Sequence, residues 1–223
     1  MENKRLLRTT AENTIIWIDL EGVLIEVDSL FYLMRYKPNL AIKSILKGAI
    51  KTISEKIKNW KTDFRKELIR NVKKEYEEKM SQIELYIFGR RIFDFQSKKH
   101  KENLVNLMKT LKKYDIYIVT YTEKHIAKGF LDCLPAELRV KTENIISSKE
   151  KEAIIDYLKN KNKNKKIVGI GDSYIDEKAL ERSDVACILS SYINKVLGCK
   201  IKYGYKFNNL AELNKFFIAI YDK

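Results

Sequence analysis

Short apolar runs alternate with longer amphipathic segments over much of the chain. Residues 14–18 form a compact β-branched and aromatic run, which is typical of a strand buried in a parallel sheet. Similar runs predict strands at 116–119, 167–170 and 185–189, and a weaker one at 144–147. Helical periodicity predicts helices at 101–113, 123–133, 149–160, 176–182 and 209–218. This alternation indicates βαβ units, so we expect an α/β fold with a Rossmann-like parallel sheet.

The segment between the first two predicted strands has a different pattern. Its apolar residues recur at spacings of three and four, for example at Ile42, Ile45, Leu46, Ile50, Ile53 and Ile57. Pro38 disfavours helix at Lys37 and so predicts a break between two helices. The stretch is too long for an ordinary crossover. We therefore expect a helical insert at 28–96, placed on a core formed by 1–27 and 97–223.

Composition narrows the class of protein and of partner. The 223 residues are 45% hydrophobic, as in globular proteins, and carry a formal net charge of +14. Such a charge favours an anionic partner, although dispersed solvated lysines in a lysine-rich chain are the preferred explanation. Three cysteines without CxxC spacing argue against a disulfide framework and a zinc site. With no secretory signal and no membrane-spanning run, we expect a cytoplasmic protein; secretion into a host cell is the alternative.

Reactive side chains follow three of the predicted strands. Asp19 ends the first strand and Glu21 follows it; Thr120 ends the second, while Asp172 and Asp176 follow the strand at 167–170. Ligands of open α/β sheets bind beyond the carboxyl ends of the strands, so we expect these groups to converge. A carboxylate at Asp19 can attack phosphorus, and acidic side chains can hold Mg²⁺ beside it. Glu21 is placed to act as acid and base.

An ammonium group is also expected at this edge, because it would stabilise the phosphoryl oxygens together with the Thr120 hydroxyl. It should lie on the helix before the strand at 167–170. Lys151 begins an amphipathic pattern there and is preferred, and Lys149 is the alternative.

These residues resemble the ordered motifs of the haloacid-dehalogenase superfamily. Segment 19–24 (Asp-Leu-Glu-Gly-Val-Leu) is similar to the first motif, 118–120 to the second and 171–176 (Gly-Asp-Ser-Tyr-Ile-Asp) to the fourth. The helical insert is similar to the all-helical cap of the phosphoserine-phosphatase-like subgroup. The resemblance implies a sheet of strand order 3-2-1-4-5 and a phosphatase that depends on Mg²⁺.

The resemblance also implies a role for each matching residue. Asp19 would be the nucleophile, Glu21 the acid and base, and Thr120, Lys151 and Gly22 the phosphate-binding groups. The metal ligands would be Asp19, the Glu21 backbone carbonyl, Asp172 and Asp176. Most such phosphatases have Asp where this chain has Glu21, which resembles the phosphoserine:homoserine phosphotransferase branch and leaves the efficiency of the acid–base step open.

The leading expectation is hydrolysis of a small organic phosphate, phosphoserine-like among others, with Phe31 and Arg35 of the insert as substrate contacts. Arg65 and Lys37 are further polar candidates in the insert. One alternative is a protein phosphatase acting on phosphotyrosine, as a bacterial effector. Another is a catalytically weak basic module that binds an anionic membrane or nucleic acid. For the enzyme we expect no DNA or RNA partner, and peripheral contact with an anionic membrane stays open.

Overall fold

The computed structural model describes residues 11–59, 64–190 and 204–221. Within these ranges six parallel strands form one sheet in the order β3-β2-β1-β4-β5-β6. The strands are β1 (Thr14–Ile18), β2 (Asp115–Thr120), β3 (Ile145–Ser147), β4 (Lys166–Gly171), β5 (Val185–Leu189) and β6 (Tyr205–Phe207). The expected α/β class and the order 3-2-1-4-5 are confirmed. The sixth strand was not predicted, because three edge residues carry too short a pattern.

Strand β1 lies between β2 and β4 in the middle of the sheet, and all five of its residues are buried. Ile18 is paired with Ile118 of β2 on one side and with Ile170 of β4 on the other. Trp17 donates its indole N–H to the Ser183 hydroxyl at 2.7 Å, which satisfies the polar atom of this large buried ring. The three central strands therefore end at the same level, and side chains that follow them meet at one edge.

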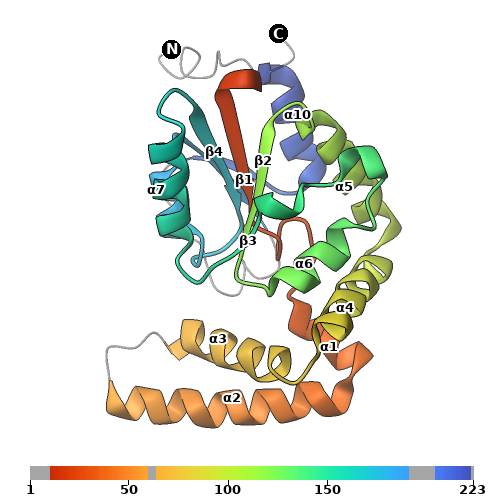
Figure 1. Cartoon of the computed structure of the whole chain (residues 1–223), viewed down its shortest axis with the longest axis vertical. Helices are drawn as coiled ribbons and strands as arrows, with labels where there is room; N and C mark the ends of the chain where they lie inside the picture. Colours follow the sequence, from red (N-terminus) through yellow and green to blue (C-terminus); the bar gives the residue numbers. More distant parts are fainter. Residues whose placement is uncertain (1–10, 60–63, 191–203, 222–223) are drawn as a thin grey trace.

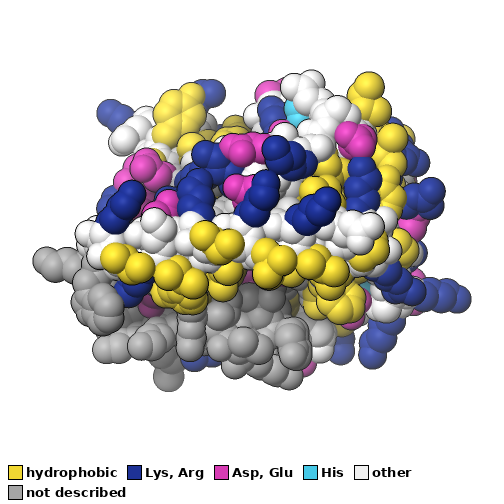
Figure 2. All heavy atoms as spheres, turned by 90° about the horizontal axis from the view of Figure 1, so that it is seen from below, with side chains coloured by type: hydrophobic (Ala, Val, Ile, Leu, Met, Phe, Trp, Pro, Cys, Tyr) yellow, Lys and Arg dark blue, Asp and Glu magenta, His cyan; other side chains and the backbone are white. Residues whose placement is uncertain are grey.

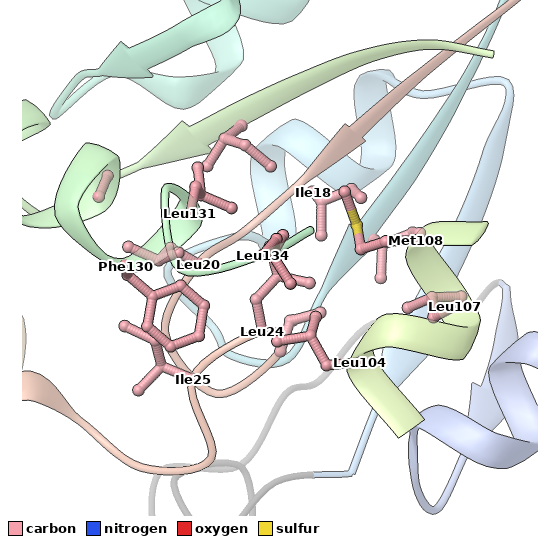
Figure 3. Close-up of a cluster of buried hydrophobic side chains, with 14 of the residues drawn as sticks. Ile18, Leu20, Leu24, Ile25, Leu104, Leu107, Met108, Phe130, Leu131 and Leu134 are labelled. Carbon is pink, nitrogen blue, oxygen red and sulfur yellow. The ribbon is translucent and has the colours of Figure 1, made fainter. Parts of the chain in front are cut away.

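Helices cover both faces of the sheet (Figure 1). They are α5 (Lys98–Leu111), α6 (Lys124–Leu131) and α10 (Leu210–Tyr221) on one face, and α7 (Lys151–Lys161) and α8 (Glu177–Arg182) on the other. Short 3-10 turns lie at Ala11–Asn13, Ala136–Leu138 and Thr142–Asn144. Figure 3 shows Leu20 and Leu24, from the turn after β1, packed among side chains of α5 and α6. This packing holds the turn next to the candidate site.

The helices between β1 and α5 are α1 (Ser29–Tyr36), α2 (Pro38–Lys58), α3 (Phe64–Glu77) and α4 (Gln82–Phe95). They fall within the range expected for the helical insert, and its status as a separate cap domain stays a prediction. Pro38 is the first residue of α2, as the predicted break at Lys37 requires. Helix α4 packs closely on α6, whereas α2 and α3 form a hairpin beyond the carboxyl ends of the strands (Figure 1).

Two glycines allow α4 to approach α6. A Cβ on Gly89 would lie 2.1 Å from the Ile126 carbonyl oxygen, and one on Gly129 would lie 2.1 Å from that of Tyr86. The close backbone approach ties α4 to the layer of helices on the sheet. None of the helices in the described ranges is both long and apolar enough to cross a bilayer.

Candidate active site

Asp19 lies at the carboxyl end of β1, in the middle of the sheet. Its backbone N–H donates to the Ile170 carbonyl of β4 at 2.9 Å, which extends the pairing by one residue. Its Oδ1 accepts the N–H of Leu20 at 2.7 Å, and the residue is only 6% exposed. The strand therefore fixes a buried carboxylate at the edge where ligands bind in such sheets.

The chain turns back sharply after Asp19, and Gly22 makes the turn feasible. The Gly22 N–H donates to the Ile25 carbonyl at 2.8 Å, and Gly22 has a φ of 76°. A Cβ at this position would lie 2.0 Å from Oδ2 of Asp172. Both the positive φ and the close approach to a carboxylate require glycine. The turn thus brings the segment after β1 against the segment after β4.

Three carboxylates converge at this edge, as the sequence predicts. Oxygen atoms of Asp19, Asp172 and Asp176 lie within 4.8 Å of one another, and all three residues are buried. Burial, followed by the repulsion of Asp176, raises the pKa of Asp19 to about 6 despite the opposing attraction of Lys151. Such a crowded set of buried oxygen donors matches the ligand type that Mg²⁺ prefers.

Lys151 supplies the positive charge of this cluster. Its Nζ lies 2.7 Å from Oδ1 of Asp19 and 2.6 Å from Oδ1 of Asp176, and the residue is 1% exposed. Burial disfavours the ammonium form, but the attraction of Asp176 and Asp19 outweighs it and raises the Lys151 pKa. Lys149 is exposed, and its carbonyl accepts the Tyr121 hydroxyl at 2.6 Å. Of the two lysines weighed from the sequence, Lys151 is the one that reaches Asp19.

The second oxygen of Asp176 stabilises the loop after β4. Its Oδ2 accepts the N–H groups of Asp172 and Ser173 at 3.1 and 3.2 Å, and the Ser173 hydroxyl at 3.2 Å. Gly171 leaves room for this contact, because a Cβ there would lie 2.8 Å from Cβ of Asp176. Asp176 therefore orients both Lys151 and the Asp172 backbone, whatever it contributes to a metal.

Thr120 occupies the end of β2, one strand away from Asp19. It is 1% exposed, and its Oγ1 accepts the backbone N–H of Thr122 at 3.1 Å. The Thr122 hydroxyl is also buried and has no hydrogen-bond partner among the described residues. The structure thus places a hydroxyl at the expected strand end, within the turn that connects β2 to α6.

The Glu21 carboxylate is bound by residues of the helical insert, from α1 and α3. Its Oε1 accepts the Ser29 N–H at the start of α1 at 3.0 Å, and its Oε2 forms an ion pair with Lys73 of α3. Lys73 also lies 3.4 Å from Oδ2 of Asp28, the N-cap residue of α1. Glu21, two residues after Asp19, is therefore positioned by the start of α1 and by Lys73 of α3, which is far from it in sequence.

Sequence reasoning missed Lys73. It is one lysine of many, and nothing in the helical period marks its side chain as buried. Burial lowers the Lys73 pKa to about 8, although Glu77 and Asp19 partly offset this effect. Burial also raises the pKa of Glu77 to about 7, against the attraction of Lys73. The one available signal was the position of Lys73 and Glu77 four residues apart on α3, which places them on one helix face.

A cavity of about 30 Å³ lies among these groups. It is lined by Asp19, Glu21, Asp28, Ile69, Lys73, Tyr121, Lys151, Asp172, Ser173 and Ile175. Phe31 and Arg35, the expected substrate contacts, instead line a separate cavity of about 660 Å³ on the other side of the turn after β1. Lys37 is paired with Glu84 at 2.6 Å, and the Arg65 side chain lies outside the described residues.

No protein-family model matches the sequence, and no curated protein matches it either. Solved structures do match. Phosphoserine phosphatase from T. onnurineus aligns with a TM-score of 0.54 at 16% identity, over 93% of this chain and 96% of that chain. A dehalogenase aligns with a TM-score of 0.51 at 11% identity, over 91% and 96%. DsGPDH of Dunaliella salina aligns with a TM-score of 0.64 at 10% identity, over 99% of this chain but 37% of that one.

Identities this low show the fold alone. The chain shares its fold with this phosphoserine phosphatase and this dehalogenase, and this is the fold expected from the resemblance to the haloacid-dehalogenase superfamily. What the site does must be argued from its own side chains.

Proposed function

We propose that the chain is a Mg²⁺-dependent phosphomonoesterase that uses Asp19 as its nucleophile. The observation that carries the proposal is the environment of this carboxylate. Asp19 is buried at the carboxyl end of the central strand, 2.7 Å from a buried lysine and beside two further buried acids. A structural carboxylate would need one partner; this arrangement instead gathers several charged groups that phosphoryl transfer requires.

The residues present fit a divalent cation. The cavity wall carries Asp19, Glu21 and Asp172, with Asp176 behind them, against the ammonium groups of Lys73 and Lys151. This excess of buried negative charge is costly unless a cation balances it. Asp19, Asp172 and the Glu21 carbonyl would hold the ion, with Asp176 as a further candidate. Bound Mg²⁺ would offset the repulsion between the nucleophile and a phosphate dianion.

The proposed reaction has two displacements. An oxygen of Asp19 attacks phosphorus, the bond from phosphorus to the leaving alkoxide breaks, and an aspartyl-phosphate forms. Glu21 protonates the alkoxide in this step. In the next step Glu21 takes a proton from a water molecule whose oxygen attacks phosphorus; the bond from phosphorus to the Asp19 oxygen breaks, inorganic phosphate leaves, and Asp19 is regenerated. Lys151 orients Asp19, and it would stabilise the transferring oxygens together with Thr120 and the Gly22 segment.

Contacts around Glu21 support its use in place of the more common Asp. Its longer side chain reaches both the Ser29 N–H and Lys73, so two helices of the insert define where the carboxyl group lies. A general acid and base must be held within hydrogen-bond reach of the reacting group. In this chain the helical segment, and not only the turn after β1, would set that position.

A small substrate fits the cavity better than a protein loop. Ile69 and Lys73 of α3 line it, and its volume of about 30 Å³ leaves room for small groups only. A movement of α3 would widen the cavity for a phosphate ester and close it again afterwards. A phosphoprotein substrate would need a shallow open mouth, so the protein phosphatase stays the weaker alternative.

The test is a panel of small phosphate esters, phosphoserine included, assayed with Mg²⁺ on the wild-type protein and on Asp19→Asn. We expect Asp19→Asn to lower turnover by about 10⁴-fold, because the nucleophile is lost. Chelation of the metal should abolish turnover reversibly. Asp94→Asn, an exposed carboxylate of α4, is the control and should be as active as wild type.

Intermediate trapping makes the test sharper. Mass spectrometry after acid quenching should find a phosphoryl group on the peptide that contains Asp19. Turnover that persists in Asp19→Asn or in the presence of chelator would refute the proposed mechanism, as would a wild-type protein without activity on any ester of the panel.

A further inference from the structure

Helix α2 turns its small side chains toward the protein. Its buried residues are Ala41, Ser44, Gly48 and Thr52. A Cβ on Gly48 would lie 2.6 Å from Cγ2 of Val72, so the two helices of the hairpin are packed closely at this point. The Thr52 hydroxyl accepts from the Asn71 side chain at 3.1 Å. This inward face contains almost no large apolar side chain, which is unusual for a helix of 21 residues.

The large apolar side chains of α2 face outward. They are Ile42, Leu46, Ile50, Ile53 and Ile57, with exposed fractions of 47%, 60%, 69%, 51% and 77%, and we call them the apolar stripe. Their spacings of four, four, three and four keep them on one side of the helix. Figure 2 shows a row of hydrophobic side chains along the helix, on the face seen from below. Contiguous exposed apolar surface of this kind marks an interaction site.

Lysines border the apolar stripe. Lys43, Lys47, Lys51 and Lys58, which we call the lysine row, follow the stripe residues at spacings that place them along one of its flanks. In the part of the chain that the structure describes, none of these four forms an ion pair. The one acidic residue of α2, Glu55, accepts a hydrogen bond from the Asn71 side chain at 2.9 Å. The outward face is thus apolar and uniformly basic.

From this arrangement we propose that α2 attaches the protein to the surface of an anionic lipid membrane. A helix of this length spans about 31 Å, and α2 is the outermost element on its side of the molecule (Figure 1). Lying parallel to the bilayer, it would bury the apolar stripe among the acyl chains near the headgroups. The lysine row would reach the phosphates, because lysine stems cover apolar surface while the ammonium groups stay hydrated.

The chemistry of the helix favours lipid over a protein partner. Protein interfaces are enriched in aromatic residues, Met and Arg and depleted in Lys. Helix α2 contains no aromatic residue, no Met and no Arg, and its charges are lysines apart from Glu55. A second copy docked through the same stripe would bring two lysine rows together without exposed acids to pair them, which is unfavourable. An anionic lipid membrane would bury the apolar stripe and offer phosphate groups to the lysine row.

The attachment surface is separate from the proposed active site. Helix α3 lies between α2 and the cavity, and it supplies Ile69 and Lys73 to the cavity wall. Substitutions on the outer face of α2 therefore leave every residue of the proposed chemistry in place. Membrane binding and phosphatase activity can be measured and lost independently.

Vesicle sedimentation tests the proposal directly. The full chain is incubated with vesicles of phosphatidylcholine, alone or mixed with phosphatidylglycerol, at low salt and at physiological salt. We expect binding to the mixed vesicles only, weakened by salt. Lys43→Gln/Lys47→Gln/Lys51→Gln should weaken it roughly 100-fold, since each lysine near an anionic surface contributes about a fivefold gain in affinity. Leu46→Gln/Ile50→Gln/Ile53→Gln should abolish it.

Matched control variants distinguish a specific role of α2 from a general effect of surface charge or of exposed apolar side chains. Lys109→Gln/Lys112→Gln/Lys163→Gln removes the same charge from exposed positions elsewhere, and Ile83→Gln/Ile87→Gln/Ile218→Gln removes three exposed apolar side chains outside α2. Both should bind vesicles much as wild type does. Circular dichroism checks that every variant is folded.

Several results would overturn the proposal. They are a wild-type protein that stays in the supernatant with mixed vesicles, α2 variants that bind as well as wild type, or equal losses in the control variants. A lipid-free dimer that Leu46→Gln/Ile50→Gln/Ile53→Gln dissociates, without vesicle binding by wild type, would instead identify a second copy as the occupant. Binding to polyglutamate but not to vesicles would identify an acidic protein.

Discussion

The edge of the sheet and the α2–α3 hairpin enclose one small cavity but contribute to it in different ways. The edge provides three buried carboxylates with oxygen atoms within 4.8 Å of one another, and Lys151, which forms ion pairs with Asp19 and Asp176. The hairpin provides Lys73, which reaches across to Glu21 and Asp28. The edge therefore forms its ion pairs without the hairpin, whereas Lys73 of the hairpin forms its ion pairs with residues outside the hairpin.

The pKa values of the two buried lysines reflect this difference between the edge and the hairpin. Lys151 has two carboxylates within 2.7 Å, and their attraction raises its pKa despite burial. Burial dominates at Lys73 and lowers its pKa to about 8. The ammonium group of Lys151, which its partners hold in place, suits the stabilisation of a reacting group. The ammonium group of Lys73, which burial destabilises, suits a hairpin that opens and closes. If the edge carries the chemistry and the hairpin regulates access, substitutions in the two regions should differ in size and in kind.

Of the substitutions that compare the edge with the hairpin, Lys151→Met is expected to have the largest effect. It leaves Asp19 and Asp176 buried without their shared cation, so we expect turnover to fall by about 10³-fold and stability by about 3 to 5 kcal/mol. Phosphatase assays and urea unfolding measure the two losses. Lys149→Met is the control, because this lysine was the alternative from the sequence and its side chain is exposed. Comparable losses at Lys149 would mean that the edge cluster is not the catalytic centre.

Lys73→Met is expected to have a smaller and different effect. Glu21 keeps the Ser29 N–H but loses its ion pair, so kcat/KM should fall by about 10- to 100-fold, with an increased KM if Lys73 also attracts the phosphate. The neighbouring Lys74→Met is the matched control, since Lys74 is half exposed and pairs only with Glu78 at 3.5 Å in the described structure. A loss at Lys73 as large as that at Lys151 would remove the distinction between edge and hairpin.

The difference between the sheet edge and the helix hairpin also explains which features could be predicted from the sequence. Strand ends combine a buried apolar run with a polar residue, so Asp19, Thr120, Asp172 and Asp176 are recognisable, and the structure brings three of them together. The βαβ alternation predicts a parallel sheet, and the strand order follows from the resemblance. The short β6 has too few residues for a pattern and was missed.

Helical periodicity was less informative. It predicts that a helix has an apolar side, but not whether that side meets the protein or the solvent. The apolar stripe of α2 has the period of a core-facing helix and is nevertheless exposed. For the same reason Phe31 and Arg35 were assigned to the site although they line another cavity, and the buried Lys73 was not recognised. Which side of each helix is buried depends on tertiary contacts between residues more than 50 positions apart in sequence, such as Lys73 and Glu21.

Gly48→Ala tests the hairpin as a unit. The added Cβ would lie 2.6 Å from Cγ2 and 2.8 Å from the backbone nitrogen of Val72, so α2 and α3 must separate. We expect a stability loss of about 1 to 3 kcal/mol, because overpacking at a close helix contact is not offset by the better helix propensity of Ala. Ser54→Ala, an exposed position of α2, is the control and should be neutral or slightly stabilising. A Gly48 variant as stable as wild type would mean that the helices are not closely packed in solution.

The smallest effect is expected at the edge itself, from Thr122→Val. The Thr122 hydroxyl is buried and has no hydrogen-bond partner among the described residues, so its removal leaves no group unpaired. We expect stability to be unchanged or to rise by up to about 1 kcal/mol, without loss of turnover. Thr120→Val makes the contrast, because the Thr120 hydroxyl accepts the Thr122 N–H and would contact the phosphate; it should lower turnover by about tenfold or more. Comparing the two variants distinguishes an effect on the packing of the turn from loss of the Thr120 hydroxyl. Equal losses of turnover in both variants would show that the conformation of the turn matters and not the Thr120 hydroxyl.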